Sequence, residues 1–380
     1  MKKKTLESWC SLLILPILAL LLYEYSKTIT MGGDAWRVGD WLINYNAGPV
    51  RRGLLGSLFI WLNNFVWPLV WLVFATQAAL YSALYIIVFA IYRATNPSTI
   101  WLILLLSPAF ILFPFYSFEG GFRKEIITFV SFSALCLAYA TRRGWIIAVS
   151  VATPLFVAGC FSHEANCLTL PFFLYMAWRG YQDQFFGKIG SAFFAILLVA
   201  GSTTAFAFAA YYRGDSTIAA GVCQSLLDRG LKEGVCQGAI SWLNNSAAIG
   251  LEQVKNQVNR NLWPYLISLS IALSPILLIK GWRRETTLAF LAGFFSLIPL
   301  YIVAVDWGRW IHIFVFFLFC FAMAEGAKGR LQPRFQRAPI LLILTYLTSW
   351  RIPHCCDGWS INKGFAAIAY EQLATLASRF

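Results

Sequence analysis

Long runs of apolar residues alternate with short polar loops along almost the whole chain. Several runs extend for 17 or more residues without a charged side chain. A helix needs about 20 such residues to cross a bilayer core of roughly 30 Å, so the pattern predicts an all-α, polytopic bundle of transmembrane helices. We expect about eleven spans, at residues 8–26, 66–92, 99–117, 125–141, 145–161, 167–178, 191–212, 263–280, 286–305, 311–325 and 339–350.

Residues 53–65 are apolar but directly precede the second run. Joining the two would give about 40 residues, which is twice what a bilayer requires. Asn63 and Asn64 also interrupt the run. We therefore expect a separate helix at the membrane surface, at the end of a first outer loop that covers residues 26–65.

The composition agrees with a membrane protein, because 59% of the residues are hydrophobic and only 12% are charged. That charged fraction is about half the value of an ordinary soluble domain. The net charge of +13 would be compatible with nucleic-acid binding, yet the basic residues are scattered through short loops. Membrane topology explains them better, so we expect no nucleic-acid partner. We find no internal repeat and no linker, and expect one membrane domain over residues 1–380.

The distribution of basic residues favours a cytoplasmic N-terminus. Lys2–Lys4 and the apolar run behind them resemble a secretory signal, but no small-x-small cleavage motif follows, so we expect an uncleaved first span. In this orientation the inner loops hold 15 of the 30 Lys and Arg residues within about 50 residues, against about 120 residues outside. We expect a bacterial inner membrane protein whose outer loops face the periplasm.

The longest hydrophilic segment, residues 213–262, falls on the outer side and forms a large outer loop. It contains Cys223 and Cys236, whose spacing is compatible with a disulfide in an oxidising compartment. Coincidence is the alternative, since most other cysteines lie in spans and look like small core hydrophobes.

Acidic residues and histidines gather on the outer side. The inner loops hold four of the 17 acidic residues, namely Glu7, Asp183, Glu285 and Glu325. The outer loops hold the other 13 and all three histidines, His163, His312 and His354. This asymmetry is the main indication of where chemistry takes place.

The first outer loop carries two carboxylates and a pair of arginines. Asp34 and Asp40, close to the first span, could supply a general base. Arg51 and Arg52, at the start of the expected surface helix, could bind phosphate oxygens with help from the helix N-terminus. A plain polar loop is the alternative, but arginines on the outer side run against the usual topology and need a reason.

The turn between the third and fourth spans offers a second cationic pair. The glycines after Glu119 permit a tight turn, and Arg123 with Lys124 could bind phosphate. The alternative is a simple connector in which both cations pair locally with Glu125.

Two short outer turns hold the remaining candidates. His163 and Glu164 lie between very apolar spans, where a base or proton relay is an alternative to interfacial capping. Asp306 and Arg309 are three residues apart and can pair on one helical face, while the neighbouring tryptophans could anchor at the interface or stack on a sugar.

The segment from His354 to Asp357 has metal-ligand residue types. Their adjacency prevents a tetrahedral site, and no second Cys/His pair has the usual spacing, so we expect no metal. Residues 365–380 could lie along the membrane surface as an amphipathic helix.

In general layout the chain resembles the multi-span, GT-C-like glycosyltransferases that use polyprenyl-phosphate sugars, and the Wzy-type O-antigen polymerases. The resemblance covers the arrangement of spans, with Gly33-Asp34, Pro49–Gly53, His163-Glu164 and Asp306–Trp310 as local motifs. It implies catalysis at the outer face on a polyprenyl-diphosphate-linked oligosaccharide within membrane lipid, without a nucleotide sugar or other cofactor. A flippase or chain-length regulator of the same pathway could be a partner.

These residues give one mechanistic hypothesis. Five cations would hold the diphosphate: Arg51, Arg52, Arg123, Lys124 and Arg309. Asp34, Asp40 or His163 with Glu164 would deprotonate the attacking sugar hydroxyl, and Asp306 is a further catalytic candidate.

Two alternatives come from other classes of protein. A lipid-linked glycan flippase or transporter predicts ionisable residues in the middle of spans, which are nearly free of charge here. A membrane acyltransferase that modifies surface glycans would use His163 as base and an acyl donor from the inner side.

Overall fold

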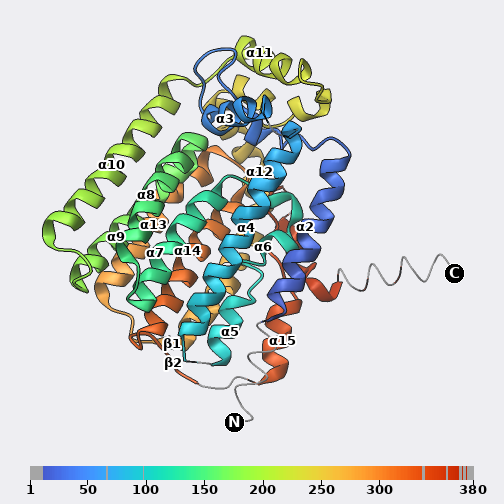
Figure 1. Ribbon diagram of the computed structural model, residues 1–380. Coiled ribbons are helices and arrows are strands. Elements are labelled where there is room, and N and C mark those ends of the chain that lie inside the picture. The colour runs from blue at the N-terminus through green and yellow to red at the C-terminus, as the bar shows by residue number, and fades with distance from the viewer. Residues whose placement is uncertain are drawn as a thin grey trace.

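The computed structural model describes residues 12–65, 67–96, 98–335, 339–356 and 358–367, together with Tyr370 and Ala374. These residues are mostly helical, and their strands are Ile279–Lys280 (β1) and Gln332–Pro333 (β2), which pair antiparallel. The long helices run side by side between two ends of the molecule (Figure 1). The all-α prediction is therefore confirmed for the described part of the chain.

Six of the described helices are long and apolar enough to cross a membrane. They are α4 (Leu69–Ala94), α8 (Trp145–Ser162), α10 (Lys188–Tyr211), α12 (Ala247–Leu273, continued by the 3-10 turn Ser274–Leu278), α13 (Arg284–Val303) and α14 (Trp307–Ala327). This finding indicates a membrane-embedded protein. The number of eleven spans and the orientation stay predictions.

Shorter helices complete the bundle and its two ends. They are α2 (Ile14–Thr30), α3 (Gly53–Asn63), α5 (Thr99–Leu105), α6 (Phe113–Tyr116), α7 (Glu125–Thr141), α9 (Leu170–Gln182), α11 (Ser216–Leu227) and α15 (Ile340–Thr348). Short 3-10 helices include η1 (Asp40–Leu42), η2 (Phe118–Gly120), η3 (Glu164–Thr169), η4 (Glu233–Cys236), η5 (Ser241–Asn244) and η7 (Gly358–Asn362). The helix expected over residues 53–65 is present as α3, while its location at a membrane surface stays a prediction.

The expected span at 99–117 is wrong as a single helix. The chain leaves α5 at Leu105 and forms a turn before α6 begins. Pro108 disfavours helical backbone at the residue before it, and the Ser107 hydroxyl instead accepts a hydrogen bond from the Ala109 N–H at 3.2 Å. A hydropathy window does not register such a break, because the run stays apolar throughout.

The expected outer segment at 213–262 contains regular helix near both of its ends, while its location on the outer side stays a prediction. Helix α12 already begins at Ala247, well before the apolar run at residue 263. This first part of α12 is polar and contains Glu252, Lys255 and Arg260. A prediction from runs of apolar residues therefore does not detect it as helix. Within the loop, Cys223 and Cys236 form a disulfide with an S–S distance of 2.04 Å, which joins α11 to η4.

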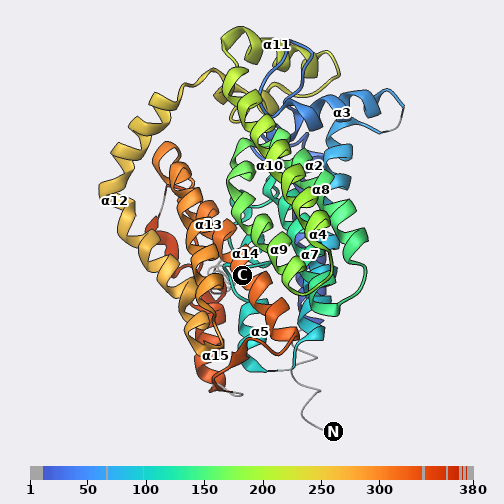
Figure 2. The same cartoon turned by 90° about the vertical axis from the view of Figure 1, so that its left-hand side faces the viewer.

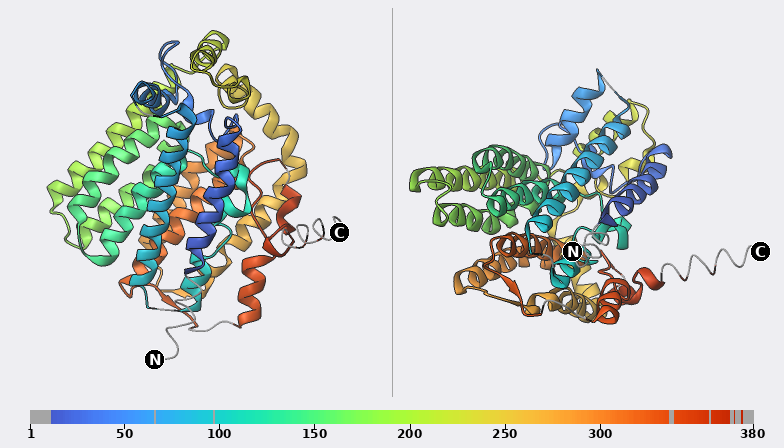
Figure 3. Two further views of the ribbon diagram at one scale, coloured as in Figure 1. Left: turned by 45° about the vertical axis from the view of Figure 1, so that its right-hand side comes forward. Right: turned by 60° about the horizontal axis from the view of Figure 1, so that its bottom comes forward.

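Helix α14 is the centre of the bundle, and all its residues from Trp307 to Gly326 are buried. It contacts α4, α7, α12 and α13. Aromatic rings fill the space around it, with Phe129 stacked on Phe316 at 4.1 Å and Phe172 stacked on Phe317 at 4.6 Å. With the bottom of the molecule turned toward the viewer, the N-terminal, middle and C-terminal helices occupy three separate sectors (Figure 3, right).

The two ends of the bundle differ. Helices α3 and α11 gather at one end, whereas the β1–β2 pair lies at the other (Figures 1 and 2). We call the first the outer end and the second the inner end, following the expected orientation. The starts of α7 and α14 meet at the outer end.

An ion-pair network ties helices together at the inner end. Arg179 pairs with Glu325 at 2.5 Å, and Arg330 pairs with Asp183 at 2.8 Å. Lys328 also pairs with Asp183. These contacts join the ends of α9 and α14, so the network stabilises the bundle on the side away from the acidic outer loops.

Candidate functional site

Ionisable side chains from four separate segments meet at the outer end. Hydrogen bonds, ion pairs and mutual electrostatic effects connect them into one group, which we call the outer cluster: Asp40, Arg51, Arg52, Arg123, Lys124, Glu125, His163, Glu164, Asp306 and Arg309. Nine of the ten candidate catalytic and diphosphate-binding residues from the sequence belong to it, and Glu125 is an addition. Asp34 is the exception.

Glu164 holds both arginines of the first outer loop. Its two carboxylate oxygens accept a fork of hydrogen bonds from Arg52, Nε at 2.8 Å and Nη2 at 2.5 Å. Arg51 Nη1 lies 3.4 Å from the same carboxylate. Burial raises the pKa of Glu164, but Arg52 more than offsets this effect and leaves that pKa well below its usual value. Glu164 is therefore an ionised group that positions two guanidinium groups.

Arg52 has an unusual backbone conformation. Its φ of 68° lies in the left-handed region, which costs a residue with a side chain about 1–3 kcal/mol. The surroundings hold it there, because Lys124 Nζ donates to the Arg52 carbonyl oxygen at 3.2 Å and Glu164 binds its side chain. The conformation turns the chain directly into α3.

Asp40 and Lys124 form a buried pair below the arginines. Lys124 Nζ lies 3.7 Å from Asp40 Oδ1, and Arg52 Nη1 lies 3.9 Å from the same atom. Burial lowers the pKa of Lys124 to about 8, with Asp40 acting against it. Burial also raises the pKa of Asp40, but Lys124 and Arg52 keep it below its ordinary value, so both groups are charged at neutral pH. Asp40 Oδ1 makes no hydrogen bond within the described structure.

Glu125 pairs across the bundle and not with its neighbours in sequence. Arg309 binds Glu125 Oε1 and also donates to Asp306 Oδ2 at 2.7 Å, so the expected Asp306–Arg309 pair is present. Arg123 instead donates to the carbonyl oxygens of Trp36 and Glu119. Sequence reasoning missed the role of Glu125 because its partner lies 184 residues away.

His163 is neutral and its ring is held by the backbone. The Nδ1 atom accepts a hydrogen bond from the Ala165 N–H at 3.1 Å, which assigns the proton to Nε2. Burial lowers the pKa of His163 to about 4, and Arg52 acts in the same direction. At neutral pH the ring can therefore donate a hydrogen bond, whereas its accepting nitrogen is occupied.

Asp34 stabilises a local turn and takes no part in the outer cluster. Its Oδ1 accepts hydrogen bonds from the backbone N–H groups of Trp36 at 2.8 Å and Arg37 at 2.7 Å. Its Oδ2 accepts from Arg37 Nε at 2.8 Å. These contacts shape the first outer loop and account for both oxygens of Asp34 without any group of the outer cluster.

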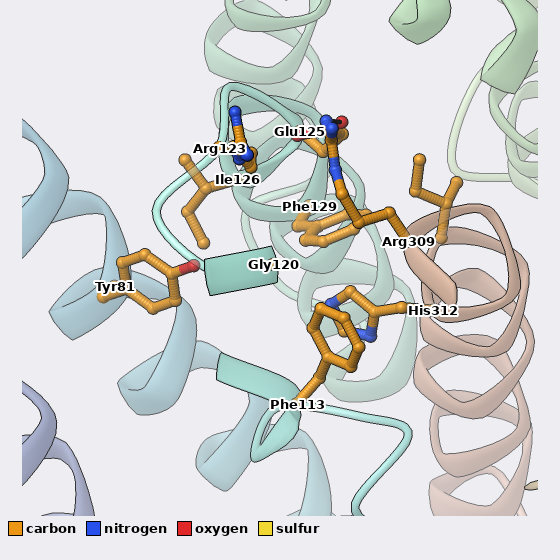
Figure 4. Close-up of a pocket in the computed structure, with 10 residues that line it drawn as sticks. Tyr81, Phe113, Gly120, Arg123, Glu125, Ile126, Phe129, Arg309 and His312 are labelled. Carbon is orange, nitrogen blue, oxygen red and sulfur yellow. Dashed lines mark hydrogen bonds and ion pairs between the residues drawn. The ribbon is translucent and has the colours of Figure 1, made fainter. Parts of the chain in front are cut away.

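A small cavity lies beside the outer cluster, between the starts of α7 and α14 (Figure 4). Its volume of about 20 Å³ is room for one water molecule. His312 Nδ1 lies 3.1 Å from the Ala109 carbonyl oxygen, and its ring stacks on Phe113 at 4.2 Å. The lining residues are Tyr81, Phe113, Gly120, Arg123, Glu125, Ile126, Phe129, Arg309, His312 and Ile313.

A much larger apolar groove of about 600 Å³ is lined in part by chain neighbours of the arginine pair. It is lined by Tyr45, Pro49, Leu54, Phe161 and Phe208. Pro49 and Leu54 flank Arg51 and Arg52 in the chain, and a Cβ atom at Gly53 would collide with the Tyr45 ring at 2.2 Å. The glycine therefore lets the start of α3 pack directly against the groove wall.

One group of side chains has metal-ligand character. Ligand atoms of Asp306, His354 and Cys355 all lie within 4.8 Å of one another. However, Cys355 is bonded to Cys356 and Asp306 is paired with Arg309, so neither supplies a free anionic ligand. The donor set does not fit a metal ion in this state. Asp357 and residues 375–380 lie outside the described residues, as do Lys2–Lys4 and Glu7.

No protein-family model, no curated protein and no solved structure matches this chain significantly. The resemblance to glycosyltransferases and polymerases stays an expectation.

Proposed function

We propose that this protein is a glycosyltransferase or polymerase that acts on polyprenyl-diphosphate-linked glycans at the outer face of a bacterial inner membrane, in surface polysaccharide synthesis. One observation carries the proposal. A pair of arginines, fixed by one carboxylate at the start of a helix, lies directly beside a large apolar groove. A lipid diphosphate has a strongly anionic head next to a long apolar chain. A site that binds it therefore requires cationic side chains beside an apolar surface.

The head group would bind at the arginine pair. Arg51, Arg52 and Lys124 outnumber the two carboxylates that they contact, Asp40 and Glu164, so this half of the outer cluster has a surplus of positive charge. Helix α3 begins here without a side-chain cap, and its first N–H groups add to the attraction for phosphate.

The first isoprenoid units of the lipid would occupy the apolar groove. Its volume lies within the range of ordinary ligand pockets, and all five lining residues are apolar or aromatic. Burial of each methylene group contributes about 0.8 kcal/mol. The groove and the arginines together would fix the anomeric carbon of the donor sugar at the outer cluster.

Asp40 is our choice for the base. It would take the proton of the acceptor hydroxyl, whose oxygen attacks the anomeric carbon while the bond to the diphosphate oxygen breaks. The electron pair of that bond leaves with the lipid diphosphate, which Arg51, Arg52 and Lys124 stabilise. Asp40 suits this role because it is ionised and its Oδ1 makes no hydrogen bond within the described structure.

His163 would donate a hydrogen bond in this scheme. Its Nδ1 is occupied by the Ala165 N–H, which argues against the general base that an acyltransferase would need there. We therefore favour glycosyl transfer over acyl transfer.

The test is reconstitution in liposomes with a synthetic polyprenyl-diphosphate oligosaccharide, followed by analysis of product length. Wild type should give longer lipid-linked products. Asp40→Asn should lower the rate by about 10²–10⁴-fold, the usual contribution of a general base. Glu24→Gln, which alters an exposed pair with Lys27, should leave the rate unchanged and serves as the control. Equal rates for Asp40→Asn and wild type would refute the assignment of the base.

A further inference from the structure

The small cavity between α7 and α14 differs in chemistry from the arginine pair. Three buried polar atoms of its lining residues have no hydrogen-bond partner in the described structure, namely Glu125 Oε2, Arg123 Nε and Arg309 Nε. These residues are all at least nine-tenths buried. Buried polar groups are normally paired, so this concentration of unpaired atoms indicates a place for a polar ligand.

The charges here are balanced. Arg123 and Arg309 lie close to the carboxylates of Glu125 and Asp306, which act on both guanidinium groups electrostatically. A second phosphate would meet the Glu125 carboxylate at close range and would be repelled. A neutral ligand fits better.

A hydroxyl group satisfies both kinds of unpaired atom. Its O–H donates to a carboxylate oxygen, and its oxygen accepts from a guanidinium N–H. Phe113, Phe129 and the His312 ring supply flat surfaces beside these polar atoms (Figure 4), which suits the alternating polar edges and apolar faces of a sugar ring.

We infer that this cavity is the acceptor subsite, in which Glu125 and Arg309 bind a hydroxyl group of the acceptor sugar next to the one that reacts. This inference rests on the proposed function and deepens it. It assigns the donor diphosphate to the arginine pair beside the groove and the acceptor glycan to the cavity between α7 and α14.

The cavity holds only one water molecule as it stands, so a sugar requires a segment to move. The segment from Arg351 to Cys356 lies over it. A Cβ atom at Gly120, which lines the cavity, would stand 2.6 Å from His354 Cβ, and one at Gly308 would collide with the Pro353 carbonyl oxygen. Arg351 Nη1 also donates to the Tyr116 carbonyl oxygen at 3.3 Å. Displacement of this segment is the most direct way to open the cavity to the outer side.

Thiol labelling tests the subsite without relying on catalysis. Ile313→Cys places a thiol in the cavity lining, and Ile311→Cys places one on the same helix, equally buried, but not in the lining. A membrane-impermeant maleimide should react with Ile313→Cys from the outer side, and a soluble acceptor oligosaccharide at ten times its Kd should slow this reaction by about tenfold. Ile311→Cys should show no protection. Lack of labelling at Ile313→Cys, or labelling that the oligosaccharide does not slow, would overturn the inference.

Kinetics give the second readout. Glu125→Gln should raise the KM for the acceptor by about 10–100-fold, as expected for loss of a hydrogen bond to a charged group, with a much smaller effect on kcat. Asp40→Asn should instead lower kcat. Unchanged acceptor KM in Glu125→Gln would overturn the inference while leaving the proposed function intact. If wild type transfers nothing, the proposed function fails, and the labelling still decides whether the cavity binds a glycan.

Discussion

At the outer end, the carboxylate of Glu164 fixes the guanidinium groups of Arg51 and Arg52 in one place. Loss of this carboxylate leaves Arg52, which is largely buried, without its main counter-charge. Because the pair is partly screened by solvent, we expect Glu164→Gln to destabilise the protein by about 1–3 kcal/mol. Thermal unfolding in detergent measures this effect. Glu24→Gln removes an ion pair whose side chains are about half exposed and should shift the midpoint little, so similar shifts for both variants would contradict the structural role of Glu164.

The Asp40–Lys124 pair predicts a pH dependence. Lys124, with a pKa of about 8, loses its proton as the pH rises through that value, and Asp40 then loses its nearest counter-charge. The rate of glycosyl transfer should therefore be maximal below pH 8 and fall above it. Lys124→Arg should remove this alkaline limb, because an arginine stays protonated throughout the range. A rate that stays constant through pH 8 in wild type would contradict this account of Lys124.

Much of the outer cluster could be predicted residue by residue, because arginines in loops that are expected on the outer side run against the usual topology and need a reason to be there. The ion-pair partners within the cluster could not be predicted in this way. Sequence reasoning placed Glu125 beside Arg123 and Lys124, whereas the fold brings Arg309 to it from the start of α14. Asp34 differs from the other candidates, because it lies two residues before Trp36 and its carboxylate accepts hydrogen bonds from the backbone of this local turn.

At the scale of elements, the disulfide between α11 and η4 closes a loop of 13 residues in the outer segment. A link across a loop of about this size stabilises by about 3 kcal/mol in the chain-entropy view. The double variant Cys223→Ser, Cys236→Ser should therefore be cut faster by trypsin at Arg229 or Lys232, which lie between the two cysteines. Limited proteolysis of wild type and variant measures this difference. Equal cleavage rates would show that the disulfide does not stabilise this segment.

The helices were easier to predict from the sequence than their interruptions and their polar ends. The expected run at 125–141 coincides with α7, because that helix has no charged residue after Glu125 and ends where the run ends. Pro108 breaks the neighbouring run, and the polar start of α12 extends beyond the apolar residues that identified it. Hydropathy reports the solvent that a helix prefers, so it cannot locate a helix end that lies outside the apolar stretch.

At the scale of the whole molecule, α7 and α14 connect two charged networks. Tyr139 belongs to the inner network, because its hydroxyl donates to Glu325 Oε1 at 2.6 Å. Glu125 and Tyr139 lie 14 residues apart on α7, which corresponds to about 21 Å along the helix axis. A bilayer core is roughly 30 Å thick, so one of the two networks must lie at the depth of the lipid chains. The outer cluster adjoins the apolar groove, and a recessed position there would let a lipid-linked substrate enter from the side.

The expected orientation makes a direct prediction. Glu233→Cys in the outer segment and Arg143→Cys at the opposite end of the bundle place thiols at exposed positions. A membrane-impermeant maleimide applied to spheroplasts should label Glu233→Cys at once and Arg143→Cys after permeabilisation. The reverse pattern would place the outer cluster in the cytoplasm and contradict catalysis at the periplasmic face.

The central claim is that the outer end lengthens a lipid-linked glycan. The most direct measurement follows a fluorescent polyprenyl-diphosphate oligosaccharide in liposomes that contain the wild-type protein, recording product length and the leaflet that holds the label in the same sample. The account predicts a ladder of longer lipid-linked products, with the label remaining in the leaflet that faces the outer end. Movement of the label between leaflets without any lengthening would contradict the claim and identify a flippase instead.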